Sequence, residues 1–462
     1  MNHNRPWKRV PTEAATHEAD MSSRKPNILL LFTDQQRADT IAALGNPIIK
    51  TPAMDRLARE GTAFTRCYTP SPVCIPARCS LVTGLPPHIT GCVDNQRMPQ
   101  DRPSFMEKLR KLGYQTHGVG KMHFSPDPFR MWGFETRDTS EEMPGANDDY
   151  FEFLKHRNRR RPFFLWSSFI KPHPPFESPT PWNKLYRCAG MPPPFRPDGF
   201  ERLLTHWNHF QNRYKYRDGG YDRLLQKTIR AAYYPCISFI DFQIGRILDS
   251  LGADLYNTLI LFTSDHGELL GDYGSFGKRC MLDAAARVPL IARWPKVFPA
   301  GSRCAAPATL LDLWPTFLAA AGAAKISAHR EGIDLRALLA KPRCREAVFS
   351  QFQQGALGMY MATDERWKYT WSAPDQKEFL FDLKKDPQET KPVRGPQIGR
   401  MREKLIRRFR GDHYSLPLTG GSWKKFPKAK LPEGPDAGLL FQDPADHRER
   451  LASLGEYARS NG

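Results

Sequence analysis

The sequence predicts an α/β fold with a large mixed, mostly parallel sheet flanked by helices, and a smaller C-terminal antiparallel sheet with one packed helix. Through most of the chain, short apolar runs alternate with amphipathic segments, which is the pattern of βα units. Past about residue 345 the segments alternate like antiparallel strands joined by short turns. The chain has 462 residues, more than one core usually supports. We expect a polar N-terminal extension at 1–25, a main domain at 26–345, a small α+β subdomain at 346–415 and an extended tail at 416–462.

Three apolar runs of the main domain are predicted to be buried strands because they are too short for helices. PNILLLFTD, from residue 26, delivers Asp34 to a sheet edge. FFLWSSFIKPHPPF, from residue 163, ends in prolines that surround Lys171 and His173, and NTLILFTSDHG, from residue 257, breaks into acid, imidazole and glycine. In open α/β sheets the carboxyl edge is where ligands bind, so we expect these polar groups to meet there.

Helices are predicted between these strands. The segment 51–64 has Pro52 just after Thr51 and Gly61 to stop the helix, and the segment 104–124 runs from a helix through a glycine to a strand and a loop. Further amphipathic helices are expected at 237–252, 309–322 and 398–412.

Composition limits the classes of function. The net charge of +19 predicts attraction to anions, but zinc-finger, basic-zipper and RNA-recognition motifs are missing from the sequence, so we expect no specific nucleic acid. No apolar run reaches the ~20 residues of a membrane helix, and the leader lacks the apolar core of a secretory signal. Nine cysteines without a CxxC pair indicate a reducing compartment. We therefore expect a cytoplasmic protein without a membrane partner, whose true start is Met1 or Met21.

The stretch CIPARCSLVTG, residues 74–84, places a cysteine, a proline, an arginine and a Thr-Gly turn at close spacing. Its own residues leave three interpretations open for Cys74. The thiol is buried and structural, or it is a reactive thiolate near a cation, or it becomes the working group only after modification.

Several motifs taken together resemble the formylglycine-dependent (type I) sulfatase family of the alkaline phosphatase superfamily, nearest to its choline-sulfatase-like and phosphonate monoester hydrolase-like branches. The resemblance spans roughly residues 26–390 and implies an alkaline-phosphatase-like fold. The motifs are, in chain order, TDQQRAD (33–39), CIPARCSLVTG (74–84), GKMH (120–123), KPHPPF (171–176), SDHGELLGDYG (264–274), GKR (277–279) and FLFDLKKDP (379–387).

This resemblance implies that a formylglycine-generating enzyme oxidises Cys74 to an aldehyde. A thiolate that attacked sulfate would give a thiosulfate ester with no easy exit. The hydrated aldehyde instead has one hydroxyl to attack sulfur and a second whose proton loss expels sulfate. Modification therefore explains why a cysteine stands at this position.

The resemblance also implies one divalent metal ion, with Ca²⁺ the family's common choice and Mn²⁺ the alternative. Many sulfatases have a second Asp after the first, whereas this chain has Gln35, as in the choline-sulfatase and phosphonate monoester hydrolase branches. Carboxylate and amide oxygens with an imidazole suit such an ion. The expected ligands are Asp34, Gln35, the modified Cys74, Asp265 and His266.

The remaining site residues receive roles by the same resemblance. Arg78 braces the hydrated aldehyde and the metal ligands, Lys121 and Lys278 contact sulfate oxygens, and Asn95 binds a sulfate oxygen. His123 takes the proton of the second hydroxyl, and His173 with Lys278 protonates the leaving alcohol. Where many relatives have Tyr-Glu after GKR, this chain has Leu282 and Asp283 in the segment that follows.

The leading functional prediction is hydrolysis of a small sulfated sugar or aryl ester. A phosphonate or phosphate diester hydrolase on the same site is the alternative within the fold, and a catalytically silent basic anion-binding protein is the alternative of another class. Aromatic and basic residues in the loops 124–150 and 178–222 suit a sugar or aryl ring without identifying it. The sequence also leaves open whether the protein forms an oligomer.

Overall fold

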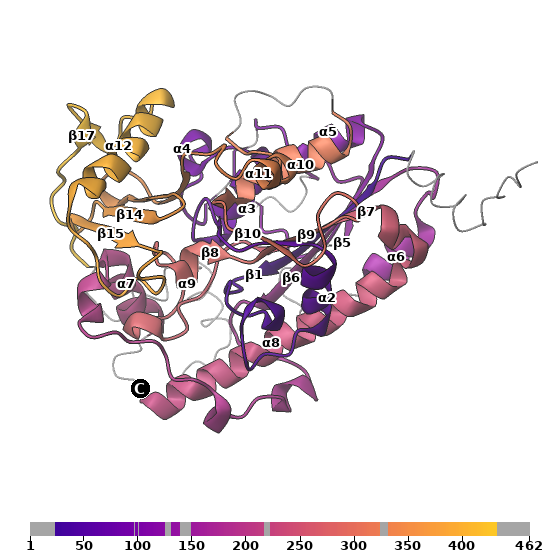
Figure 1. The fold of residues 1–462 in the computed structure, drawn as a ribbon, viewed down its shortest axis with the longest axis horizontal. Helices are drawn as coiled ribbons and strands as arrows, with labels where there is room; N and C mark the ends of the chain where they lie inside the picture. Colours follow the sequence, from indigo (N-terminus) through magenta and orange to yellow (C-terminus); the bar gives the residue numbers. More distant parts are fainter. Residues whose placement is uncertain are drawn as a thin grey trace, which may run out of the picture.

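The computed structural model describes residues 24–96, 98–99, 101–124, 131–138, 149–216, 222–323 and 331–431. Its centre is an eight-stranded sheet in the order β10-β2-β9-β7-β1-β6-β4-β5 (Figure 1). Strand β9 runs antiparallel to both of its neighbours, and the other pairs are parallel, which confirms the predicted mixed, mostly parallel sheet. The strands are β1 (Asn27–Asp34), β2 (Thr62–Phe64), β4 (Gln115–Gly120), β5 (Thr136–Asp138), β6 (Phe163–Pro172), β7 (Thr258–Ser264), β9 (Leu290–Arg293) and β10 (Ser302–Cys304).

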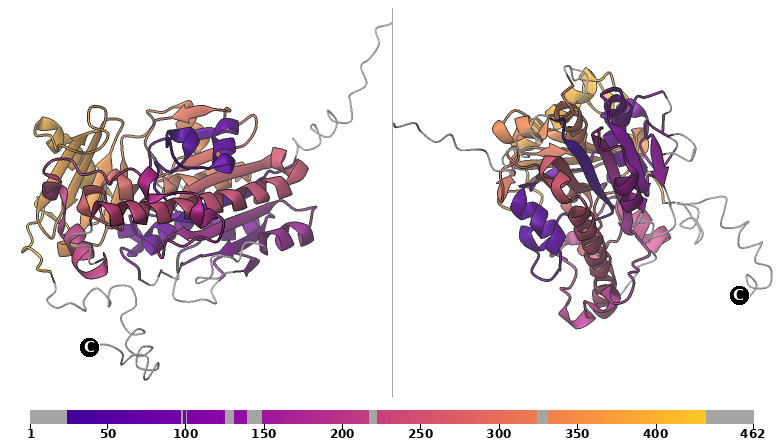
Figure 2. Two further views of the ribbon diagram at one scale, coloured as in Figure 1. Left: turned by 90° about the horizontal axis from the view of Figure 1, so that it is seen from below. Right: turned by 90° about the vertical axis from the view of Figure 1, so that its right-hand side faces the viewer.

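Helices cover both faces of this sheet, as Figure 2 shows. In β1, Leu30 and Phe32 belong to the core on one face, and Leu29 and Leu31 belong to the core on the other, because successive side chains of a strand point in opposite directions. A continuous apolar run is therefore required in the central strand. The first face carries α3 (Cys74–Thr83), α5 (Phe105–Lys111), α10 (Leu313–Ala320) and α11 (Leu335–Ala340), and the second carries α2 (Pro52–Glu60), α6 (Asp149–His156) and α8 (Arg223–Ser250).

Smaller elements join the main sheet to the rest of the chain. A three-stranded sheet in the order β11-β3-β8 lies beside it. The helix expected at 237–252 is the second half of the longer α8, whose start is capped by Asp222. The remaining elements of this part are β3 (Cys67–Tyr68), β8 (Arg287–Val288), β11 (Ala308–Thr309), α4 (Pro87–Thr90), α7 (His206–Phe210) and α9 (Asp283–Ala286).

Four neighbouring strands end at one edge of the main sheet. The register pairs Asp34 of β1 with Pro172 of β6, and Thr33 with Ser264 of β7. Asp34, His173 and Asp265 therefore leave the sheet side by side. Strand β4 adds Lys121, whose backbone N–H donates to the Ser168 carbonyl at 2.9 Å. The edge that the sequence predicts for a ligand is thus the place where its polar residues converge.

The C-terminal part contains the predicted antiparallel sheet, in the order β12-β13-β14-β15, with helix α12 packed on it. The first part of the expected tail forms a hairpin, and its Trp423 stacks on Tyr360 and Trp371 at ring-centroid distances of 5.7 and 5.8 Å. The domain boundaries stay a prediction, since residues 1–23 and those beyond 431 lie outside the described part. The elements are β12 (Val348–Phe352), β13 (Met359–Thr363), β14 (Trp367–Ser372), β15 (Lys377–Asp382), α12 (Pro396–Gly411), β16 (Leu418–Thr419) and β17 (Ser422–Trp423).

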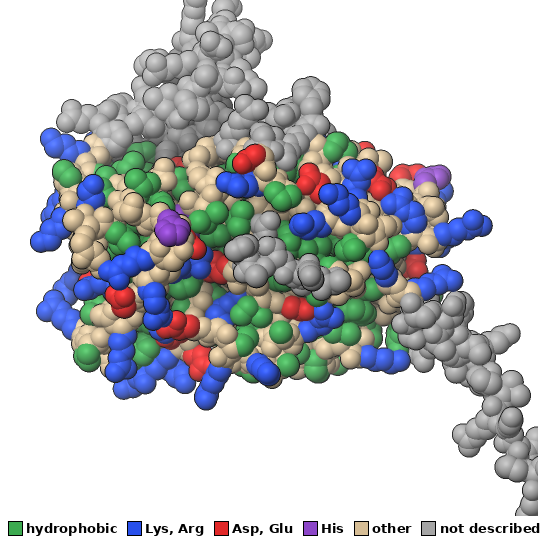
Figure 3. Space-filling view, turned by 90° about the horizontal axis from the view of Figure 1, so that it is seen from above, with side chains coloured by type: hydrophobic (Ala, Val, Ile, Leu, Met, Phe, Trp, Pro, Cys, Tyr) green, Lys and Arg blue, Asp and Glu red, His purple; other side chains and the backbone are tan. Residues whose placement is uncertain are grey.

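All nine cysteines are free thiols, which agrees with the absence of a disulfide pattern in the sequence. Within the described residues, the helices are all too short or too polar to cross a membrane. On the face drawn in Figure 3, Lys and Arg side chains are interspersed with Asp and Glu. The excess positive charge is therefore spread over this face and not gathered in one stripe.

Candidate active site

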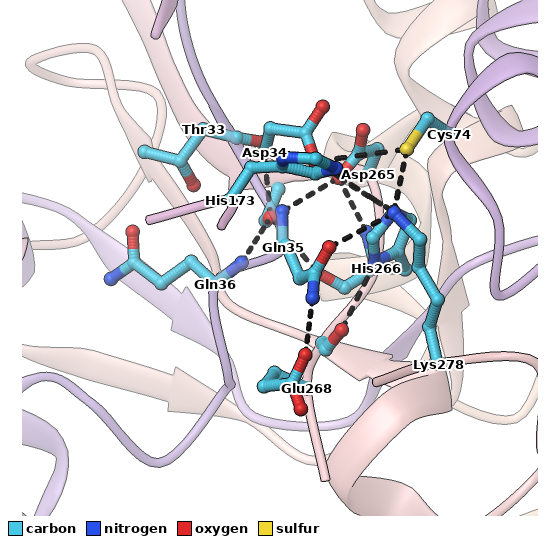
Figure 4. Close-up of polar contacts among 12 residues, drawn as sticks. Thr33, Asp34, Gln35, Gln36, Cys74, His173, Asp265, His266, Glu268 and Lys278 are labelled. Atoms are coloured by element: carbon cyan, nitrogen blue, oxygen red, sulfur yellow. Dashed lines mark hydrogen bonds and ion pairs between the residues drawn. The ribbon is translucent and has the colours of Figure 1, made fainter. Parts of the chain in front are cut away.

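Cys74 is the first residue of helix α3, and its thiol points into a buried polar cluster (Figure 4). Its Sγ lies 2.9 Å from Lys278 Nζ, 3.2 Å from His266 Nε2 and 3.7 Å from Asp34 Oδ1. Only 1% of the residue is exposed. Burial and Asp34 would raise the thiol pKa, but the ammonium groups of Lys278 and Lys121 hold the pKa well below its usual value. The environment of Cys74 is thus that of a functional group and not of an inert core thiol.

The cluster has the chemistry of a metal centre. Ligand atoms of Asp34, Cys74, Asp265 and His266 all lie within 4.8 Å of one another, and these residues are buried. The Gln35 amide oxygen approaches the same point, since it accepts a hydrogen bond from Lys278 Nζ at 2.9 Å, and Lys278 Nζ lies 3.2 Å from His266 Nε2. Hard oxygens with one imidazole suit a divalent cation.

The orientation of individual atoms supports this fit. His266 Nδ1 donates to the Gly267 carbonyl at 3.0 Å, so the lone pair of Nε2 faces the cluster, as a metal-ligating imidazole requires. Asp34 Oδ2 accepts from Arg78 and Lys121, which leaves Oδ1 toward Cys74 and His266. The residues present therefore fit a divalent ion.

Arg78 lies one helical turn after Cys74 and connects the two carboxylates. Its Nη2 donates to Asp34 Oδ2 at 3.1 Å and its Nε to Asp265 Oδ2 at 3.0 Å. Its Nη1 donates to the Lys121 carbonyl at 2.7 Å and to Ser168 Oγ at 3.1 Å. Because the guanidinium is planar and fully buried, these contacts fix the separation of the two aspartates. Arg78 thus contacts two of the residues that are expected as metal ligands.

Lys121 is placed at Asp34 by a turn that requires glycine. Gly120 has φ +84°, and a Cβ on it would lie 2.1 Å from the Ser168 carbonyl oxygen, so only glycine fits. Lys121 Nζ then lies 2.8 Å from Asp34 Oδ2. Burial alone would raise the pKa of Asp34, but the cations of Lys121, Arg78 and Lys278 hold it well below the usual value. Asp34 is thus kept ionised despite complete burial.

The two predicted histidines differ in position. His173 interacts electrostatically with Asp34, Lys121 and Lys278, and Figure 4 shows it beside Asp34. Burial, with Lys121, lowers its pKa well below the usual value. His123 follows Lys121 by two residues at φ +48°, is half-buried, and leaves Nδ1 buried without a hydrogen bond. Among the described contacts, none joins His123 directly to the cluster.

Asn95 lies beside the nucleophile's helix. Its Oδ1 accepts from the Ile75 backbone N–H at 3.2 Å, and so it satisfies one of the free donors at the start of α3. Asp283, which with Leu282 is expected to stand in place of the Tyr-Glu pair, accepts from Lys368 Nζ at 2.7 Å. Among the described contacts, Asp283 therefore joins the C-terminal sheet and not the cluster.

Sequence reasoning missed Glu268 and Ser168. Glu268 is only 1% exposed and accepts a hydrogen bond from the side chain of Gln35. Glu268 lies within the SDHGELLGDYG motif, two residues after His266. This position in the motif could have indicated a role in the site. Ser168 lies inside strand β6, where the sequence offers no sign of a polar function.

The fold and the site together define an enzyme of the alkaline phosphatase type, with a buried acid and imidazole cluster at the strand ends. Residues 26–323 match the family described as Sulfatase, and residues 271–411 match the one described as N-sulphoglucosamine sulphohydrolase, C-terminal. The chain belongs to the sulfatase family, whose members hydrolyse sulfate esters and generally use formylglycine and a metal ion. The predicted family, fold and enzyme class are thereby confirmed.

Curated relatives and solved structures agree with this assignment. The arylsulfatase of Clostridium perfringens is 28% identical over 441 residues, which cover 79% of this chain and 89% of the relative. The choline-sulfatase of Rhizobium meliloti is 28% identical over 425 residues, which cover 80% and 82%. The crystal structure of the phosphonate monoester hydrolase of Agrobacterium radiobacter is similar with a TM-score of 0.74 at 26% identity, covering 84% of this chain and 96% of that one.

Proposed function

We propose that this sulfatase cleaves its ester with a formylglycine made from Cys74 and one divalent ion, Ca²⁺ in preference to Mn²⁺. The observation that carries the proposal is the convergence of Cys74 Sγ, Asp34 Oδ1 and His266 Nε2 in one buried cluster. Asp34, Gln35, Asp265 and His266 would hold the ion together with residue 74. When bound, the ion polarises a sulfate oxygen and lowers the pKa of a coordinated hydroxyl. A ligand set made mostly of oxygens, with a single imidazole, favours Ca²⁺ over softer metals.

The modified residue supplies two hydroxyls on one carbon, one to attack sulfur and the other to release sulfate once it loses a proton. Lys278 lies where it can donate to one of these hydroxyls, since its Nζ contacts Cys74 Sγ, the atom that oxygen replaces, at 2.9 Å. Lys121 is assigned to a sulfate oxygen, because its Nζ lies in the cluster, 2.8 Å from Asp34 Oδ2. Asn95 is assigned to another sulfate oxygen through its amide NH₂, because its Oδ1 is engaged by Ile75.

His173 with Lys278 is assigned to protonation of the leaving alcohol. In the free site, burial and the neighbouring Lys121 lower the pKa of His173 and favour neutral imidazole. The negative charge of a bound sulfate ester opposes this effect, and Lys278 provides a second proton donor close by. His123, whose Nδ1 has no hydrogen bond, is assigned to the later proton removal that releases sulfate.

Substitution of the two histidines separates these steps. His173→Ala should slow sugar sulfates by about 10²–10⁴-fold, but slow aryl sulfates much less, because a phenolate leaves without protonation. His123→Ala should give a burst of one alcohol per enzyme for both substrates, with sulfate mass retained on the peptide containing residue 74. Stopped-flow kinetics and peptide mass spectrometry measure the two effects. Equal leaving-group dependence without retained sulfate would contradict the division of roles.

The substrate is proposed to be a small sulfated sugar or aryl ester. Phosphonate or phosphate diester hydrolysis is the second candidate, because Gln35 lies at the cluster and a phosphonate monoester hydrolase shares the fold at 26% identity. Comparing kcat/KM for a sulfate ester, a phosphate diester and a phosphonate ester of the same alcohol shows which of the two activities the enzyme prefers. The catalytically silent alternative requires a thiol at residue 74 and no metal in protein isolated from its own cells.

The compartment and assembly are part of the proposal. Nine unpaired thiols, including the exposed Cys344, favour a reducing compartment, and we therefore place the enzyme in the cytoplasm. A formylglycine-generating enzyme is its maturation partner, with no specific nucleic acid and no membrane. Cell fractionation tests the location, and light scattering gives the oligomeric state.

A further inference from the structure

The Gln35 side chain is fixed at both ends in the cluster. Its Oε1 accepts from Lys278 Nζ at 2.9 Å, and its Nε2 donates to Glu268 Oε2 (Figure 4). Its backbone is held too, since its N–H donates to Asp265 Oδ1 at 3.0 Å and its carbonyl accepts from Tyr233 Oη at 2.7 Å. Gln35 lies at φ +68°, a conformation that is unusual for any residue other than glycine. Hydrogen bonds at both ends of the side chain and on the backbone, together with the unusual φ, indicate that the fold holds the Gln35 amide in one orientation.

Glu268 sets that orientation. A carboxylate can only accept hydrogen bonds, so it selects the NH₂ end of Gln35 and turns the oxygen toward the cluster. The other carboxylate oxygen, Oε1, accepts from the backbone N–H groups of Leu270, at 2.9 Å, and Gly277. Glu268 is 1% exposed, so water is not available to replace these partners. Without Glu268, either end of the amide could face the cluster.

We propose that Glu268 is a positioning residue that keeps the Gln35 amide oxygen directed at the metal position. The inference rests on the proposed divalent-metal function of the cluster. In this chain a neutral amide stands where many relatives have a second carboxylate. Both ends of a carboxylate are oxygens, whereas an amide presents either its oxygen or its NH₂ to the metal position. An amide NH₂ turned toward a cation would repel it. The buried Glu268 prevents that outcome without touching the metal or the substrate.

The variant Glu268→Gln should turn the Gln35 amide over. The two backbone N–H donors at Leu270 and Gly277 require an oxygen, so the new amide must place its NH₂ toward Gln35. Two NH₂ groups then face each other unless Gln35 turns over. Turning over directs the NH₂ of Gln35 at Lys278 and the metal position. We expect a 10- to 100-fold weaker metal affinity, about the loss that outer partners of metal ligands cause.

The reciprocal double variant Gln35→Glu/Glu268→Gln is the decisive test. It keeps the net charge of the wild type and restores one donor and one acceptor across the contact. The new amide NH₂ at position 268 donates to one oxygen of the new carboxylate at position 35, and the other oxygen of that carboxylate faces the metal position. Gln35→Glu alone places two buried carboxylates in contact and should destabilise the fold. Rescue in the double variant is a result that a merely structural role of Glu268 does not produce.

The experiment uses mature enzyme that has been stripped with a chelator and titrated calorimetrically with Ca²⁺ and with Mn²⁺ in the absence of substrate. Glu268→Gln should bind 10- to 100-fold more weakly, about the range given above, and the double variant should return to within a few-fold of wild type. Glu389→Gln is the matched control. Like Glu268, Glu389 is buried and accepts from a backbone N–H, that of Asp283, but its ion pair with Lys368 lies outside the cluster.

The outcomes separate the two proposals. If wild-type enzyme binds neither ion, the proposed metal function itself is wrong. If wild type binds metal and Glu268→Gln binds equally well, or the double variant is no better than the single one, the positioning role is wrong and the metal site stands. Melting curves in chelator check that a weaker metal affinity does not reflect unfolding. Glu268→Gln loses some stability because its amide and that of Gln35 are mispaired, but it retains the acceptor for Leu270 and Gly277 and should stay folded at the temperature of the titration.

Discussion

Protein produced without a formylglycine-generating enzyme is expected to fold normally and to lose activity on the order of 10⁴-fold or more, as nucleophile removal does in other hydrolases. The fold should persist because Cys74 is already accommodated as a thiol, with 1% exposure and contacts to Lys278 and His266. Activity should disappear because a thiol that attacked sulfur would have no second hydroxyl with which to expel sulfate. The rate of hydrolysis of one aryl sulfate measures the loss of activity, and circular dichroism shows whether the protein is folded.

Mass spectrometry gives the chemical proof. In mature protein, the peptide containing residue 74 should lose one sulfur and two hydrogens, gain one oxygen, and react with hydrazides. Cys74→Ala should match the unmodified protein in inactivity, whereas Cys79→Ala, which removes a thiol from the same helix, should keep its activity. Full activity from protein with a verified thiol at residue 74 would exclude this mechanism.

The convergence of the site could be predicted from strand ends. Asp34, His173 and Asp265 each follow an apolar run, and the parallel register of β1, β6 and β7 brings them to one edge. The alternation of strand and helix likewise predicted the two-faced sheet. These features depend on local patterns and on a general rule of sheet topology, and they were therefore available from the sequence.

Contacts between side chains that are far apart in the chain could not be predicted from the sequence. The sequence assigns Lys121 to sulfate and gives no sign that its Nζ also pairs with Asp34, which lies far away in the chain. The partner of Gln35 is Glu268, 233 positions away, and the direction of an amide is set only by what surrounds it. Periodicity and motif spacing carry no information on such pairs, because each depends on the folded arrangement of several loops.

The variant Asp34→Asn is expected to remove activity and metal binding together and to lower the free energy of unfolding by about 3–5 kcal/mol, the usual cost of breaking a buried ion pair. Asp34 is completely buried and accepts from both Arg78 and Lys121. Neutralising it leaves these cations buried without their shared partner. Arg78 retains Asp265, but Lys121 has no second carboxylate among its described ion pairs.

Asparagine cannot substitute in either orientation. If its oxygen takes the place of Oδ2, it still accepts from Arg78 and Lys121, but its NH₂ then faces Cys74, His266 and the metal position. If the amide turns over, an oxygen faces the metal position, and the NH₂ meets two cationic donors.

Unfolding by urea in excess chelator measures the loss of the ion pairs without metal, and calorimetric titration of the stripped protein measures the loss of the ligand. Asp39→Asn, at a half-exposed carboxylate paired with Arg37, is the control and should change the free energy of unfolding much less. Metal affinity in Asp34→Asn equal to that of the wild type would place the ion elsewhere, whereas unchanged stability in chelator would show that solvent, and not Asp34, balances Lys121.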